Sequence, residues 1–119
     1  MKTINLLYCD LLFKETHAIL TMHENSKLTL NISNEITNHL DNHYKGKNFV
    51  FITDRKYPHE IDLAVYKGRI LKNMIGFAIV SNNPEEMKRA SKERELWNES
   101  FTFFKELSEA ENWACSFFD

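Results

Sequence analysis

The residues best suited to chemistry form a polar segment directly after the apolar run 49–52, Phe-Val-Phe-Ile. This segment offers a histidine, two acids, an arginine and two hydroxyl groups, carried by Thr53, Asp54, Arg55, Tyr57, His59 and Glu60. A histidine beside a carboxylate supplies the residue types that general acid–base catalysis uses most often. His59 with Asp54 or Glu60 therefore defines one hypothesis, an enzyme of the hydrolase type.

Two other interpretations of this segment require no catalysis. Pro58 fixes a turn, and Glu60 and Asp62 lie where the positive end of a following helix favours acidic side chains. The segment also follows a predicted strand, and open α/β sheets bind ligands outside the carboxyl ends of their strands. We therefore favour contact with a partner protein or a small ligand over catalysis here.

The histidines do not form a metal-binding pattern. His39 and His43 stand four residues apart on a predicted helix, but the zincin pattern needs Glu after the first histidine and this chain has Leu40. His17 and His23 lie on one face of a predicted strand, about 20 Å apart, which is too far to share one ion. We expect no metal ion.

Cysteines and glycines exclude other kinds of site. Cys9 and Cys115 have no CxxC spacing and no histidine beside them in sequence, so we expect ordinary buried thiols and a reducing compartment. Gly46, Gly68 and Gly76 are isolated, so no Gly-rich phosphate loop is present. We predict no cofactor.

The charge balance argues against two classes of partner. The 119 residues carry 15 Lys and Arg against 17 Asp and Glu, a net charge of −2. This balance offers no general attraction to nucleic acid or to anionic lipid surfaces. Because no signal-peptide core or membrane span can be drawn, we expect a cytoplasmic protein without stable membrane insertion.

Apolar patterning predicts a sheet that begins with a β-ribbon. Segments 3–9 and 16–23 are short and rich in aliphatic or β-branched residues, as strands are. Segments 48–53 and 74–80 contain apolar runs without polar alternation, which is typical of strands covered on both faces. A helical pattern at about 60–71 separates these two strands, so we expect a parallel crossover.

Three further helices and a strand complete the predicted order. The first helix begins at Asn31 or Ser33, ends at Gly46 as a left-handed cap, and buries a stripe made of Ile32, Ile36, Leu40 and Tyr44. A second helix begins after Asn83 with Pro84, and its alternating charges at 85–95 are typical of a solvated helix face. A strand at 100–104 and a helix at 107–117 follow.

Aromatic residues crowd the C-terminal part of the chain. Aromatic residues make 13% of the sequence, and one strand and one helix can bury only some of those near the C-terminus. We expect the others, Trp97, Phe103 and Phe118, to form an exposed patch that serves as a homodimer or partner interface. Ordinary core packing is the alternative.

Three segments together resemble a known family. These are 49–54, 75–81 and the ending 103–114, Phe-Phe-Lys-Glu-Leu-Ser-Glu-Ala-Glu-Asn-Trp-Ala. In the order of its elements, residues 17–117 resemble the SpoIIAA-like proteins, which are STAS-like and CRAL-TRIO-related. Related antagonists carry a phosphorylatable Ser or Thr after the central strand, but 54–60 contains neither. The resemblance therefore implies a fold and assigns no functional residue.

These observations predict one STAS-like α/β domain over residues 1–119, with a single mixed sheet, an N-terminal β-ribbon, βαβ crossovers and about four helices. We expect a non-enzymatic protein-interaction or regulatory module that forms a homodimer or binds another protein. The alternative is a carrier for a small ligand, a lipid or a nucleotide, with its pocket between the helix at 61–71 and the sheet. The enzyme based on His59 is the third hypothesis.

Overall fold

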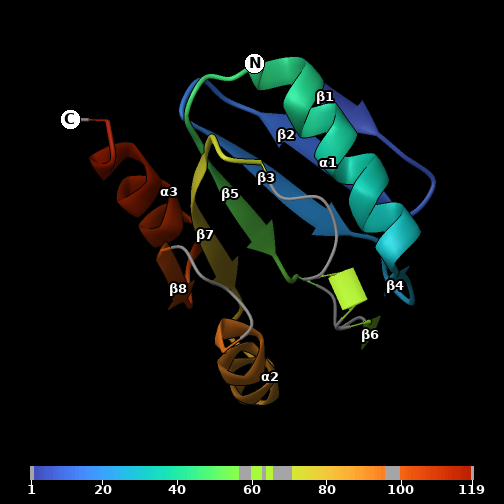
Figure 1. Cartoon of the computed structure of the whole chain (residues 1–119). Helices are drawn as coiled ribbons and strands as arrows, with labels where there is room; N and C mark the ends of the chain where they lie inside the picture. The colour runs from blue at the N-terminus through green and yellow to red at the C-terminus, as the bar shows by residue number, and fades with distance from the viewer. Residues whose placement is uncertain (1, 57–59, 63, 66–70, 96–99, 119) are drawn as a thin grey trace.

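The computed structural model describes residues 2–56, 60–62, 64–65, 71–95 and 100–118 (Figure 1). A six-stranded mixed sheet forms its centre, with the strand order β1-β2-β3-β5-β7-β8. The bounds of these strands are Lys2–Asn5 for β1, Cys9–Phe13 for β2, His17–Met22 for β3, Phe49–Asp54 for β5, Met74–Val80 for β7 and Ser100–Phe104 for β8. Strands β1, β2 and β3 are antiparallel neighbours, whereas β3, β5, β7 and β8 run parallel.

Strand β5 lies between β3 and β7, as its continuous apolar run predicted. Val50 and Ile52 are completely buried on one face, and Phe49 is completely buried on the other. The parallel pairing of β5 with β7 and the strand at 100–104 are also confirmed.

The N-terminal ribbon differs from its prediction. The expected strand over 3–9 is instead the end of β1, a turn, and the first residue of β2. The turn is closed by a hydrogen bond from the Leu6 amide to the Cys9 carbonyl at 2.8 Å, and Leu7 at its tip is 92% exposed. Apolar residues in this turn concealed the boundary, because turns are normally marked by polar residues or glycine.

Helix α1 (Leu30–Tyr44) begins earlier than predicted. Thr29 is its extended N-cap, and the Thr29 hydroxyl accepts a hydrogen bond from the amide of Ile32 at 3.3 Å, so Asn31 and Ser33 lie inside the helix. The predicted stripe is confirmed, with Ile36, Leu40 and Tyr44 buried and Ile32 packed against them. The helix ends at Tyr44, and its left-handed C-cap is Lys45 rather than the predicted Gly46, although Gly46 also has positive φ.

The helix predicted at about 60–71 is absent from the described part of this segment. Glu60–Ile61 forms a short strand, β6, which pairs in parallel with β4 (Lys27–Leu28). Ala64 and Val65 form a 3₁₀ turn in which the amide of Ala64 donates to the Asp62 carboxylate. Residues 63 and 66–70 lie outside the described residues, and the described residues contain three helices rather than about four.

Helix α2 (Pro84–Arg94) has the predicted start, because the side chain of Asn83 accepts a hydrogen bond from the amide of Glu85 at 3.0 Å and Pro84 opens the helix. Ala90 is buried, whereas Met87 is 43% exposed. Glu86 and Glu93, which belong to the face that was expected to be solvated, are buried instead.

Helices cover both faces of the sheet (Figure 1). Helix α1 packs on β2, β3 and β5, where Tyr44 stacks on Phe49 with ring centroids 4.3 Å apart. Helix α2 lies on the same face, because Ala90 packs against Phe77, whose ring stacks with Phe51. Helix α3 (Leu107–Ser116) covers the opposite face, where Ala110, Ala114, Val50, Ile52 and Ala78 form one cluster.

Candidate binding site at the carboxyl ends of the parallel strands

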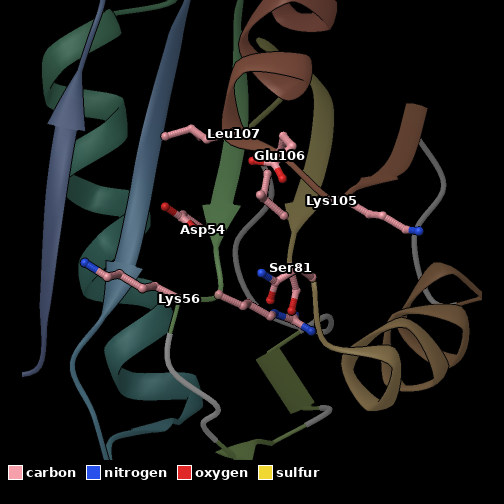
Figure 2. A pocket seen from close by; sticks show the side chains of 9 residues that line it. Asp54, Lys56, Ser81, Lys105, Glu106 and Leu107 are labelled. Atoms are coloured by element: carbon pink, nitrogen blue, oxygen red, sulfur yellow. The ribbon is translucent and has the colours of Figure 1, made fainter.

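A cavity of about 260 Å³ lies where strands β5, β7 and β8 end and α3 begins (Figure 2). It is the location at which an open parallel sheet is expected to bind a ligand. Three separate segments line it. They are the end of β5 and the residues after it (Asp54, Arg55 and Lys56), the end of β7 and the residues after it (Val80, Ser81 and Asn82), and the start of α3 with the two residues before it (Lys105, Glu106 and Leu107). Lys56 and Lys105 extend from the cavity in opposite directions, so it carries basic groups on its two flanks.

Asp54 contributes a half-buried carboxylate to the cavity. Burial raises the pKa of the half-buried Asp54 carboxyl, and the positive charge of Lys56 opposes that shift only in part. Within the described residues, no side chain or backbone amide donates a hydrogen bond to this carboxylate. Asp54 is therefore suited to accept a hydrogen bond from a group that enters the cavity.

Backbone hydrogen bonds hold the rim of the cavity in place. The amide of Arg55 donates to the Val80 carbonyl at 2.9 Å, and the amide of Ser81 donates to the Phe104 carbonyl at 3.0 Å. The buried Ser81 hydroxyl accepts from the amide of Asn83 at 3.1 Å. The two bonds between backbone groups continue the ladder of the parallel strands by one residue, so the site is built on the rigid part of the fold.

Arg55 joins this rim to α2 through a buried cluster of charges. Its guanidinium donates to the two carboxylate oxygens of Glu93 at 2.7 and 2.5 Å, and to Glu86 at 3.2 Å. Arg89 donates to the other oxygen of Glu86 at 2.8 Å. Two arginines thus balance two glutamates, which is the condition for burying charges without a large penalty.

The predicted contact residues fall in different environments. Asp54 and Arg55 both line the cavity, but Arg55 is 5% exposed and its guanidinium is engaged by Glu86 and Glu93. Thr53 is 3% exposed and is covered by the fold. Glu60 belongs to β6. Tyr57 and His59 lie outside the described residues, and the proposed acid–base set therefore stays a prediction.

The predicted aromatic interface is likewise divided. Phe118 is 41% exposed beyond the end of α3. Phe103 is half-buried and packs against the cluster that contains Phe77 and Ala90. Trp97 lies outside the described residues. The exposed aromatic surface in the described part of this region is therefore centred on Phe118.

Three of the histidines are engaged in separate contacts. His17 is buried against Glu111, His23 contacts Asp10, and His43 stacks on Phe13 with ring centroids 4.4 Å apart. Within the ranges that the structure describes, no three side chains of the His, Cys, Asp or Glu type gather closely enough to hold a metal ion.

The expectation that both cysteines are buried is wrong for one of them. Cys9 is completely buried on β2, and burial, followed by the negative charge of Asp10, raises the pKa of its thiol to about 11. Cys115 is exposed near the end of α3. The helical pattern of 107–117 indicates this difference, because Ala110 and Ala114 take the inward positions and leave Cys115 outside.

Several cavity residues were missed by the sequence interpretation. Ser81, Asn82, Lys105 and Glu106 were not among the candidates, although each follows directly or closely after a predicted strand. Reading the residues after every parallel strand, rather than after the central strand alone, would have found them.

The element order and sheet topology define an α/β protein with a SpoIIAA-like fold. The structure is similar to that of an uncharacterised protein of the DUF3478 family from Shewanella loihica PV-4, with a TM-score of 0.63 and 16% sequence identity over 94% of this chain and 98% of that chain. At this identity the likeness concerns the fold alone, and at that level the resemblance found in the sequence is confirmed. No protein-family model and no curated protein matches the sequence. None of the described helices has the length and apolar character needed to cross a bilayer.

Proposed function

We propose that this protein is a non-enzymatic binding or regulatory module whose contact site is the cavity at the carboxyl ends of β5, β7 and β8. The observation that carries the proposal is the half-buried Asp54 carboxylate, which faces this cavity without a hydrogen bond from the described residues. A partner that presents an N–H or O–H group would supply the missing hydrogen bond.

The size and lining of the cavity favour a side chain of a partner protein as the occupant. Its volume of about 260 Å³ lies below the range of about 300–1,000 Å³ that is typical of pockets for drug-sized molecules. Its lining contains four charged residues besides Arg55, namely Asp54, Lys56, Lys105 and Glu106. A lipid chain requires an apolar lining, so this cavity supports a carrier for lipids less well than it supports an interaction module.

Self-association is the form of partner binding that we favour. The 41% exposure of Phe118 supports it, because a large exposed aromatic side chain is commonly part of an interface. Leu7 is also exposed, at the tip of the turn between β1 and β2.

Native mass spectrometry of the purified protein tests both parts of the proposal. We expect a homodimer in the wild type, and a weaker dimer in Asp54→Asn, which keeps the size of the side chain but removes its charge. Glu24→Gln removes a charge from an exposed loop and serves as the matched control. A tightly retained small molecule that is lost in Asp54→Asn would instead support the carrier, and a monomer without any retained molecule would contradict self-association.

A further inference from the structure

A second cluster of reactive side chains lies at the opposite end of the sheet, where β3 begins and α3 approaches its C-terminus. It contains Lys14, Thr16, His17, Glu111 and Cys115, which meet although α3 follows β3 by about 90 residues. The Cys115 sulfur lies 3.7 Å from the Thr16 hydroxyl oxygen, within hydrogen-bonding range for sulfur. The same oxygen lies 2.8 Å from His17 Nδ1. The side chains therefore form one connected chain from an exposed thiol to a buried imidazole.

Glu111 determines which nitrogen of His17 carries the proton. Burial of Glu111 would raise its pKa, but hydrogen bonds from Lys14 and His17, together with the charge of Lys14, outweigh burial and hold the pKa below its usual value. The ionised carboxylate can only accept, so His17 Nε2, at 2.9 Å from Glu111 Oε2, is the donor. In the neutral ring, Nδ1 is then the acceptor for the Thr16 hydroxyl, and the oxygen of Thr16 is free to accept from the Cys115 thiol.

We propose that Cys115 is a peroxide-reactive thiol, activated by proton transfer through Thr16 to His17. A nucleophile, a base and a group that orients the base are the three parts from which activated nucleophiles are built. Here the nucleophile is exposed, the base is 3% exposed, and Glu111 orients the base.

The reaction balances with hydrogen peroxide as the oxidant. The Cys115 proton moves to the Thr16 oxygen as the Thr16 proton moves to His17 Nδ1. The thiolate sulfur attacks one peroxide oxygen, an S–O bond forms and the O–O bond breaks. The relay then returns a proton to the departing oxygen, which leaves as water, and the products are a sulfenic acid on Cys115 and one water molecule. Sulfur loses two electrons and the peroxide gains them.

Peroxide is favoured over a carbon electrophile because its departing oxygen must be protonated, which is the second task that a Thr–His relay performs. The proposal is independent of the proposed function, since the cluster and the cavity lie at opposite ends of the strands. Cys9 provides an internal comparison, because a buried thiol with a pKa of about 11 is almost entirely protonated at neutral pH.

The test measures sulfenic acid formation at each cysteine. The full-length protein is treated with hydrogen peroxide in the presence of dimedone, and peptide mapping by mass spectrometry gives the labelling rate of Cys115 and of Cys9. We expect Cys115 to react at least about tenfold faster than N-acetylcysteine at the same pH, and Cys9 to remain unlabelled.

Two variants at position 16 test whether Cys115 reacts fast because of the relay or only because it is exposed. Thr16→Val removes the hydroxyl and keeps the shape, so the Cys115 rate should fall at least about tenfold, while Thr16→Ser should keep the wild-type rate. Circular dichroism and the thermal midpoint establish that both variants are folded. A wild-type rate no faster than that of N-acetylcysteine would overturn the proposal without recourse to any variant, and so would an unchanged rate in folded Thr16→Val.

Discussion

Arg55 donates two hydrogen bonds to Glu93, which lies 38 residues later in the chain, and both side chains are almost completely buried, with 2% and 4% of their surface exposed. This bidentate contact attaches α2 to the end of β5. It brings a helix with an almost entirely polar sequence onto the sheet, where Ala90 supplies a small apolar contact.

Removing one partner of this pair should destabilise the protein strongly. Glu93→Gln leaves Arg55 buried without its full charge partner, so the free energy of unfolding should fall by about 3 kcal/mol or more. Urea unfolding followed by circular dichroism measures this change. The control is Lys88→Met on the exposed side of α2, where Lys88 and Glu85 are 77% and 78% exposed and 3.8 Å apart, and its effect should stay within about 0.5 kcal/mol. Equal effects of the two substitutions would contradict a structural role for the buried pair.

A side chain at position 76 should separate α3 from the sheet. A Cβ atom on Gly76 would lie 3.1 Å from Trp113 and 3.2 Å from Phe117, which is closer than ordinary contact. Gly76→Val adds two further methyl groups there and should lower the free energy of unfolding by about 1–3 kcal/mol. Denaturant unfolding measures it, and Trp113 fluorescence should report a more exposed ring. Unchanged stability together with unchanged fluorescence would show that α3 adapts without strain.

The pKa values of two histidines near the N-terminal ribbon should be shifted in opposite directions, upward for His23 and downward for His43. The hydrogen bond that His23 donates to Asp10, aided by the one that it donates to the Leu7 carbonyl, raises the pKa of His23 despite some desolvation. Burial, followed by the positive charges of Lys2 and the N-terminus, lowers the pKa of His43. Asp10→Asn should therefore lower the pKa of His23 and leave that of His43 unchanged, as measured by NMR titration of the imidazole protons.

This shift also gives the sign of a pH effect on stability. The folded state favours protonated His23, so its contribution is fully present below the ordinary histidine pKa and is lost as the pH rises through the raised value. If the pKa of His23 is the same in Asp10→Asn and in the wild type, the hydrogen bond to Asp10 does not cause the raised pKa.

Asp54→Asn should stabilise the protein at neutral pH while it weakens partner binding. Burial raises the pKa of Asp54 because the folded state disfavours the ionised form, so stability is lost as the pH rises through this pKa. The amide does not ionise, and the variant should show a higher thermal midpoint than the wild type at pH 7 with a smaller difference near pH 4. Thermal unfolding at the two pH values measures this, and a lower midpoint at pH 7 would indicate that Asp54 stabilises the fold instead.

The central strands were predictable because a continuous apolar run requires cover on both faces of the strand. The start of α2 was predictable because Asn83 and Pro84 act on the backbone next to them. The start of strand β2 could not be predicted, because Leu6, Leu7 and Tyr8 occupy a turn that polar residues would normally mark. The burial of Glu86 and Glu93 depends on Arg55, a partner far away in sequence, and no local pattern distinguishes these glutamates from exposed ones. Likewise, Asp54 was recognised as a candidate from its strand, whereas the other half of its cavity comes from two later segments.

The contact of α3 with the sheet has a mechanical consequence. Ala110 and Ala114 are the buried residues of α3 and pack in one cluster with Ala78, while Trp113 and Phe117 lie over Gly76. The polar contacts of Glu111 with Lys14 and His17 also hold the helix at one position along its axis. A substitution of Glu111 is therefore expected to permit a shear of α3 over the sheet, with the helix still folded, and Leu107 at its other end would move with it.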